Sequence, residues 1–255
     1  MPTAPRALLL DFGGVLVDGP VPPGPAAPLV REALTAAGVP VPETLDADLT
    51  AGLTAYGHWR EATVRQPAPV EVTHREFWTG YVAADWPVEA RTVVAERATE
   101  LSRVLTRLDE LEVRPGTVEL LADVTGRGVP IAIVSNTLCG AAHRDFLAGA
   151  GLGERFAVQL YSDEAGIRKP NPELIRRAAK AVGAVPEECW YVGDTWSRDV
   201  RCGRRAGVGT TVLMRSSRSG AEAVPPGLSA DLEVADPVEL HAALRAAWSA
   251  APSAS

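Results

Sequence analysis

The chain has 255 residues, and its 25 basic and 32 acidic side chains give a net charge of −7, which argues against a nucleic-acid-binding protein. No apolar stretch approaches the roughly 20 residues of a membrane-spanning helix, and the apolar run 7–10 is too short for the core of an export signal. The three cysteines are too few for a disulfide framework and fit no zinc-binding spacing. We therefore expect a cytoplasmic protein without membrane or nucleic-acid partners, either a monomer or a homodimer.

The first predicted strand, residues 6–12, is followed by a segment of different character. Residues 20–28 form a stiff, proline-rich connector, and residues 29–112 read as helical with no convincing strand. Aromatic side chains of this segment predict the core of a small helical subdomain: Tyr56, Trp59, Phe77, Trp78, Tyr81 and Trp86. We expect residues 1–17 and 113–255 to form one α/β core and residues 18–112 to form a helical cap inserted into it.

After residue 113, short apolar segments alternate with stretches compatible with helices. The apolar segments predict strands at residues 130–135, 157–162, 189–192 and 209–213, and the helices are predicted at 117–127, 141–150, 172–182, 198–206 and 238–248. Nearly continuous apolar strands are typical of a parallel sheet buried on both faces. The pattern predicts a Rossmann-like, doubly wound α/β fold. Residues 216–230 read as a mobile surface loop, and the tail after Trp248 as frayed.

Polar residues follow four of the predicted strands, where the ligands of open α/β sheets bind. Each one alone is compatible with an ordinary helix cap or turn, but together they would meet at one edge of the sheet: Asp11, Ser135, Asn136, Lys169, Asp194 and Asp199. Lys169 and Lys180 are the only lysines among the 25 basic residues. A lysine retained in such an arginine-rich chain hints at a position where a compact ammonium is needed.

Three carboxylates that converge repel one another unless a cation lies between them. Oxygen ligands in small number suit Mg²⁺, which keeps several waters and accepts a phosphate oxygen. Lys169, Ser135 and Asn136 would supply a positive charge and hydrogen-bond donors to a phosphoryl group. A carboxylate is then a plausible nucleophile, because an aspartyl-phosphate divides one difficult step into two easier ones.

Four motifs of this chain, LLLDFGGVL, VSNT, IRKPNPELI and VGDTWSRD, resemble in order and spacing those of the haloacid dehalogenase-like (HAD) hydrolase superfamily. The segment between Asp11 and Pro115 resembles that superfamily's helical cap of the first type. The resemblance implies that Asp11 is the nucleophile, that Ser135 binds phosphate with Asn136 beside it, and that Lys169 balances charge. It also implies a Mg²⁺ site of Asp11, Asp194, Asp199 and the backbone carbonyl of Gly13, acting on a small phosphorylated metabolite.

The chain departs from this pattern at Gly13, where phosphatases of the superfamily usually carry a second aspartate that acts as general acid and base. Its loss predicts a slower phosphatase, since general acid–base catalysis contributes roughly 10²–10⁴-fold. Restoring it by Gly13→Asp is expected to raise turnover several-fold. Candidate substitutes for the missing acid are His58, Glu61, His74 and Asp18.

Two other functions remain open at this point. Dehalogenases of the superfamily also lack the second aspartate, because displacement of a halide needs no proton donor. They need no metal, however, and their fourth motif differs, so the Asp194–Asp199 pair favours phosphoryl transfer. The second alternative is a non-catalytic HAD-like protein that binds a phosphorylated ligand.

Overall fold

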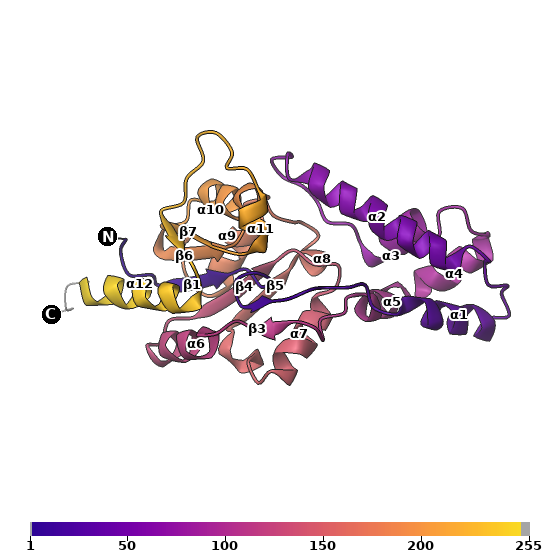
Figure 1. Cartoon of the computed structure of the whole chain (residues 1–255), viewed down its shortest axis with the longest axis horizontal. Coiled ribbons are helices and arrows are strands. Elements are labelled where there is room, and N and C mark those ends of the chain that lie inside the picture. Colours follow the sequence, from indigo (N-terminus) through magenta and orange to yellow (C-terminus); the bar gives the residue numbers. More distant parts are fainter. Residues whose placement is uncertain (1, 251–255) are drawn as a thin grey trace.

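The computed structural model describes residues 2–250, and its centre is a sheet of six parallel strands (Figure 1). The strand order is β5-β4-β1-β6-β7-β8, so the chain starts in the middle of the sheet and extends it in both directions. The strands are β1 (Ala7–Leu10), β4 (Ile131–Ser135), β5 (Val158–Tyr161), β6 (Cys189–Gly193), β7 (Thr210–Met214) and β8 (Leu232–Val234). The predicted doubly wound α/β fold is therefore confirmed, although the short edge strand β8 was not predicted.

Both faces of the sheet are buried, which explains why the central strands are apolar without alternation. In β1, Leu8 and Leu10 face a core cluster that contains side chains of α6, α7 and α12, whereas Ala7 and Leu9 face another that contains side chains of α9 and α10. These helices span Thr117–Gly126 (α6), Gly140–Gly149 (α7), Glu173–Ala181 (α9), Arg201–Ala206 (α10) and Pro237–Ala250 (α12). Short helical turns complete the core at Gly153–Arg155 (η2), Ser162–Ala165 (α8), Pro186–Glu188 (η3) and Trp196–Val200 (η4).

The predicted helical segment forms a layer of its own beside the sheet, called the helical insert below (Figure 1). It contains α1 (Ala26–Ala36), α2 (Leu45–Thr63), α3 (His74–Glu76), η1 (Phe77–Val82), α4 (Val88–Glu96) and α5 (Ala98–Leu105). The predicted aromatic residues do form its core: Tyr56, Phe77, Trp78 and Trp86 are buried, and Trp59 and Tyr81 pack against them. None of the helices described between residues 2 and 250 is both long and apolar enough to cross a bilayer.

Two predictions of secondary structure are wrong. Residues 29–112 end in a strand, because Glu112–Val113 (β3) pairs antiparallel with Val17–Asp18 (β2). Residues 216–230 are not simply a surface loop, since Ser217–Ala221 form helix α11, which Ser216 caps at its N-terminus. The predicted frayed tail is helical as far as Ala250, and its remaining residues lie outside the described part of the chain.

A loop of the helical insert is bound to the segment of the core that leads into Lys169. Glu71 N–H donates to the carbonyl of Gly166 at 3.1 Å, and Arg168 N–H donates to the carbonyl of Pro69 at 3.3 Å. The Glu71 carboxylate also forms an ion pair of 3.0 Å with Arg168, and each side chain is only 1% exposed. The hydroxyl of Ser162 donates to Glu71 at 2.6 Å. The helical insert is thereby held directly against the backbone next to Lys169.

A second polar contact between insert and core involves His74 on α3. Its Nε2 lies 3.3 Å from Asp163 Oδ2 and donates to the carbonyl of Leu138 at 2.8 Å. The hydrogen bond to Asp163, helped by Cys139, raises the pKa of His74 to about 10 even though burial opposes the charge. The imidazolium form therefore stabilises the contact.

Glu71→Ala should lower the free energy of unfolding by about 3–5 kcal/mol, because it leaves the Arg168 guanidinium buried without its partner. Urea denaturation at neutral pH measures the loss. The matched control is Glu164→Ala, which removes an exposed ion pair with Arg144 and should cost less than about 1 kcal/mol. Equal, small losses in the two variants would contradict the importance of the buried pair.

The stabilisation provided by His74 should depend on pH. Since its pKa rises from 6.5 to about 10 on folding, the contribution is fully present below pH 6.5 and is lost as the pH rises toward 10. The difference in unfolding free energy between wild type and His74→Gln should shrink across that range. A difference that stays constant from pH 6 to 10 would show that the imidazolium does not form in the folded protein.

Candidate active site

Three carboxylates converge at the carboxyl edge of the sheet, as the sequence predicts. Asp11 follows β1, Asp194 follows β6 and Asp199 lies in η4, and each offers an oxygen within 4.8 Å of the others. All three side chains are buried. Because buried anions repel one another strongly, the cluster requires cations within it.

Lys169 provides one such cation. Its Nζ lies 3.0 Å from Asp11 Oδ1 and 2.7 Å from Asp199 Oδ1, and it donates to the hydroxyl of Tyr191 at 3.0 Å. Burial alone would lower the pKa of Lys169, but Asp11 and Asp199 reverse this and raise it. Burial likewise would raise the pKa of Asp199, yet Lys169 and a hydrogen bond from Thr195 hold it well below its ordinary value. Lys169 and Asp199 are therefore charged.

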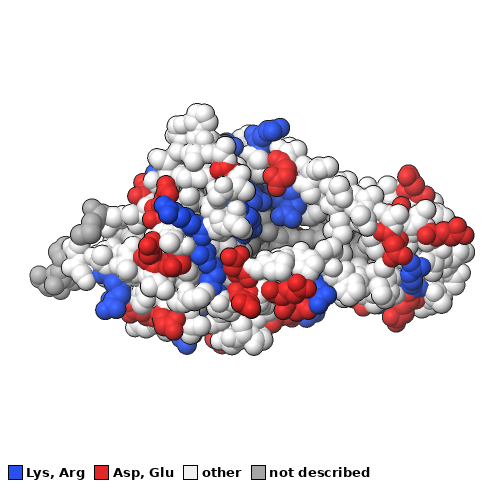
Figure 2. Space-filling model, in the orientation of Figure 1, with Lys and Arg blue, Asp and Glu red and all other residues white. Residues whose placement is uncertain are grey.

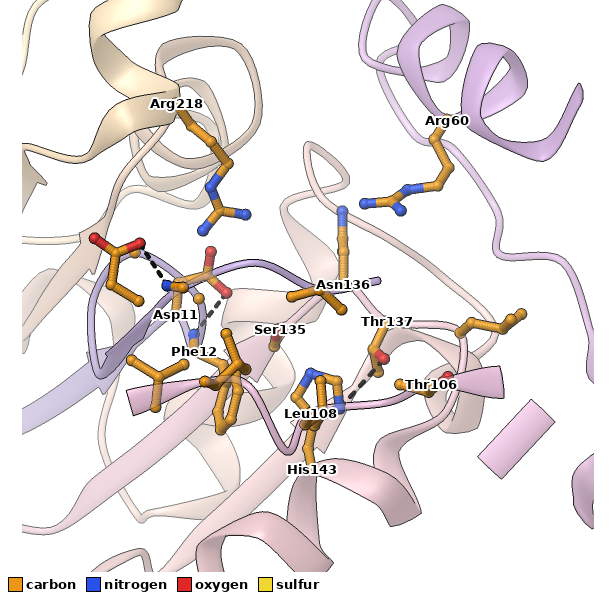
Figure 3. A pocket seen from close by; sticks show the side chains of 18 of the residues that line it. Asp11, Phe12, Arg60, Thr106, Leu108, Ser135, Asn136, Thr137, His143 and Arg218 are labelled. Carbon is orange, nitrogen blue, oxygen red and sulfur yellow. Dashed lines mark hydrogen bonds between the residues drawn. The ribbon is translucent and has the colours of Figure 1, made fainter. Parts of the chain in front are cut away.

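The two residues at the end of β4 differ in their surroundings. The Asn136 side chain is occupied by the backbone of Lys169: its amide donates to the Lys169 carbonyl at 2.9 Å, and its oxygen accepts from the Lys169 N–H at 2.8 Å. Asn136 thus holds Lys169 in position, a role that its place in the sequence did not reveal. Ser135 borders the adjoining pocket (Figure 3).

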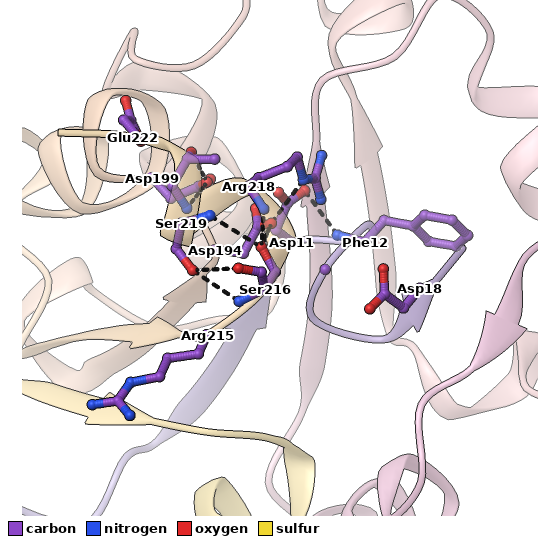
Figure 4. Close-up of polar contacts among 12 residues, drawn as sticks. Asp11, Phe12, Asp18, Asp194, Asp199, Arg215, Ser216, Arg218, Ser219 and Glu222 are labelled. Carbon is purple, nitrogen blue, oxygen red and sulfur yellow. Dashed lines mark hydrogen bonds and ion pairs between the residues drawn. The ribbon is translucent and has the colours of Figure 1, made fainter. Parts of the chain in front are cut away.

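Arg218 on α11 is the second cation at the cluster, and no motif in the sequence points to it. Its Nε donates to Asp194 Oδ2 at 2.8 Å, and the hydroxyl of Ser216 donates to the same oxygen at 2.6 Å (Figure 4). Glu222, which directly follows α11, accepts hydrogen bonds from the N–H groups of Trp196 and Ser197 and so links α11 to η4. Burial raises the pKa of Asp194 to about 6, although Arg218 opposes the shift.

The glycine pair after Asp11 lies directly under Arg218. A Cβ on Gly13 would stand 2.9 Å from Arg218 Nη2, so the guanidinium occupies space into which a longer side chain at this position would extend. Gly14 has a φ of +75°, and a Cβ there would overlap the Asp194 carboxylate. Gly14 is therefore required for the close approach of the first loop to Asp194.

The donor set of this cluster fits a hard divalent cation. Three carboxylates converge within 4.8 Å, and Asp194 Oδ1 is buried without a hydrogen-bond partner among residues 2–250. Oxygen ligands in this number suit Mg²⁺, which retains several waters. One oxygen of Asp194 is therefore oriented for a ligand while the other is bound by Arg218 and Ser216.

A pocket of about 540 Å³ lies between the carboxylates and the helical insert. Figure 2 shows the opening between these two parts of the molecule, with basic side chains along it. The core side chains Asp11, Ser135, Asn136, Lys169 and Asp199 line the pocket on one side, and Leu53, Tyr56, Gly57 and Arg60 of α2 line it on the other.

The candidates for the missing acid lie in different places. Asp18 lines the pocket, whereas His58 and Glu61 are exposed outside it and His74 is engaged between insert and core. His143, which the sequence did not single out, also lines the pocket. Burial lowers its pKa to about 4, so its imidazole, packed against Phe12, is neutral.

The fold and site together define an open α/β protein with a carboxylate cluster and a pocket at the carboxyl edge of its sheet. A family model of haloacid dehalogenase-like hydrolases matches residues 5–207, and the chain belongs to this family. The resemblance found in the sequence motifs is thereby confirmed.

The curated relatives include several phosphatases. The chain is 38% identical over 142 residues to phosphoserine phosphatase of Thermus thermophilus, covering 55% of each protein. It is 30% identical over 135 residues to glyceraldehyde 3-phosphate phosphatase of Methanopyrus kandleri, covering 53% of this chain and 58% of the relative. The chain thus spans little more than half the length of these relatives.

Solved structures show the shared fold over nearly the whole chain. The 2-haloacid dehalogenase of Pseudomonas syringae pv. Tomato DC3000 has a TM-score of 0.60 at 17% identity, covering 97% of this chain and 100% of that one. The HAD-hydrolase YfnB of Bacillus subtilis, bound to magnesium, has a TM-score of 0.56 at 16% identity, covering 95% and 99%.

Proposed function

We propose that the protein is a Mg²⁺-dependent phosphatase that acts on a small phosphorylated metabolite through an aspartyl-phosphate on Asp11. The observation that carries the proposal is the charge arrangement at Asp11, where a buried lysine and two further carboxylates surround one reactive carboxylate beside a pocket. The phosphatases among the relatives support the same reaction class.

One oxygen of Asp11 is fixed and the other is available. Oδ1 accepts from the Phe12 N–H at 2.8 Å and contacts Lys169 at 3.0 Å. In the proposed first step, Oδ2 forms a bond to phosphorus while the bond between phosphorus and the ester oxygen breaks, and the ester oxygen leaves as an alkoxide that takes a proton from water. Water then attacks the aspartyl-phosphate, which releases inorganic phosphate and regenerates the Asp11 carboxylate.

The surrounding residues have separate tasks in this proposal. Lys169 balances the charge of Asp11 and of the phosphoryl oxygens, Ser135 donates to a phosphoryl oxygen, and Asn136 keeps Lys169 in place. Asp194, Asp199, Asp11 and the backbone carbonyl of Gly13 would hold Mg²⁺, which reduces repulsion between the anionic nucleophile and the substrate. The helical insert, residues 18–112 in our assignment, acts as a cap that excludes water.

Asp11→Asn should abolish phosphate release from p-nitrophenyl phosphate, because the amide is a poor nucleophile. Removal of Mg²⁺ with a chelator should do the same to the wild type, and added Mg²⁺ should restore activity. Phosphate release that persists in either case would refute the mechanism.

The alternatives give different results in the same assays. A dehalogenase would release halide from a short 2-haloacid without metal. A protein that only binds a phosphorylated ligand would turn over neither substrate, yet inorganic phosphate with Mg²⁺ would raise its melting temperature.

Gly13→Asp alone should raise turnover only slightly, because the new carboxylate would pair with Arg218. This revises the several-fold gain expected from the sequence. In an Arg218→Ala background, the same substitution should raise kcat at least about fivefold, a part of the usual contribution of a general acid. The kcat values of the four proteins on p-nitrophenyl phosphate measure the effect. No gain in either background would mean that another group protonates the leaving alcohol.

A further inference from the structure

Two arginines face the pocket without an acidic partner. Arg60 extends from α2 of the helical insert, and Arg198 comes from η4 of the core. Both are half-buried, and within residues 2–250 neither has a carboxylate within ion-pair distance. Arg168 and Arg218, by contrast, are paired with Glu71 and Asp194.

The electrostatic surroundings of Arg60 are unfavourable for a cation. Burial lowers its pKa, the nearby charges of Arg168 and Arg198 lower it further, and Tyr56 and Glu71 oppose this shift only in part. Its guanidinium lies 5.8 Å from the centre of the Tyr56 ring, a contact that leaves the N–H donors unused. Arginine stays charged in proteins, so charge and donors are available for an anion that enters the pocket.

The acidic side chains of the pocket do not neutralise this charge. Asp11 and Asp199 are both bound to Lys169. Asp18, the third carboxylate in the lining, is exposed and accepts from the Gly19 N–H. Glu71 and Asp199 act on Arg60 and Arg198 only from beyond ion-pair distance, so within residues 2–250 neither guanidinium has a paired carboxylate.

Arg60 lies on the side of the pocket away from the reacting carboxylate. Figure 3 shows its guanidinium reaching from the insert toward Asn136, whereas Arg218 lies above Asp11. Leu53, Tyr56 and Leu108 provide apolar lining. With a volume of about 540 Å³, the pocket suits a small ligand that carries one anionic group at Lys169 and another at Arg60.

We infer that Arg60, together with Arg198, forms a second anion-binding subsite, and that the substrate is a small phosphate ester bearing a second anionic group, either a carboxylate or a further phosphate. The inference rests on the proposed phosphatase function for the identity of the first group. Arg60 then selects the substrate by binding the second anionic group, which is carried by the alcohol that leaves.

Binding of non-hydrolysable ligands tests the subsite separately from catalysis. Isothermal titration calorimetry in the presence of Mg²⁺ would compare 3-phosphonopropionate, which carries a carboxylate, with propylphosphonate, which has an uncharged tail. We expect the first to bind at least about tenfold more tightly, as for a charge-assisted hydrogen bond. Propane-1,3-bisphosphonate distinguishes a second phosphate-like group from a carboxylate.

Arg60→Gln should remove the preference, and Arg60→Lys should restore part of it. Arg65→Gln is the matched control, since Arg65 follows the same helix but is exposed and outside the pocket. The ratio of the two dissociation constants within each variant is the readout, and thermal melting verifies folding. Equal affinities in the wild type, absence of binding by every ligand, or a preference unchanged in Arg60→Gln would overturn the inference.

Failure of the proposed function gives a different pattern. If the wild type prefers 3-phosphonopropionate but hydrolyses no phosphate ester, the subsite stands and the phosphatase proposal falls. If p-nitrophenyl phosphate is hydrolysed but the charged and uncharged ligands bind equally, the phosphatase proposal stands and the subsite falls.

Discussion

The balance of charge around Asp11 is the constraint on which the rest of the structure depends. Asp11, Asp194 and Asp199 come from separate segments and are buried within 4.8 Å of one another. Lys169 bridges two of them, and Arg218 pairs with the third. The parallel sheet brings these residues together, because the carboxyl ends of its strands meet at one edge. The helical insert in turn supports Lys169, since Glu71 and Pro69 bind the backbone immediately before it.

The sequence predicted the parts of the fold whose signals are local. Central strands such as Ile131–Ser135 are continuously apolar because both sides are buried, and their ends could be located to within a few residues. Asp11, Lys169, Asp194 and Asp199 were predicted to meet because each follows such a strand. The hint from lysine usage held for Lys169, which is buried among carboxylates, but Lys180 is an exposed residue of α9.

Contacts between distant segments could not be predicted in the same way. Glycine, serine and proline in residues 216–230 resemble a loop, and only the fold shows that Arg218 reaches Asp194. The pairing of Val17–Asp18 with Glu112–Val113 involves two residues on each side, too few for a periodic pattern. Arg60 is one arginine among many in the sequence. Its importance follows from its orientation toward the pocket and from the lack of a carboxylate beside it within residues 2–250.

The pairing of Arg218 with Asp194 has a consequence for how much of the site's charge balance the chain provides itself. Three buried carboxylates repel one another unless positive charge lies near them, whether it comes from the chain or from a bound ion. Here a side chain from helix α11 already neutralises the most deeply buried carboxylate, with Ser216 as a second donor. The chain therefore supplies two cations of its own, Lys169 and Arg218, to three buried carboxylates, so a bound divalent ion would add to a charge balance that the polypeptide has already begun.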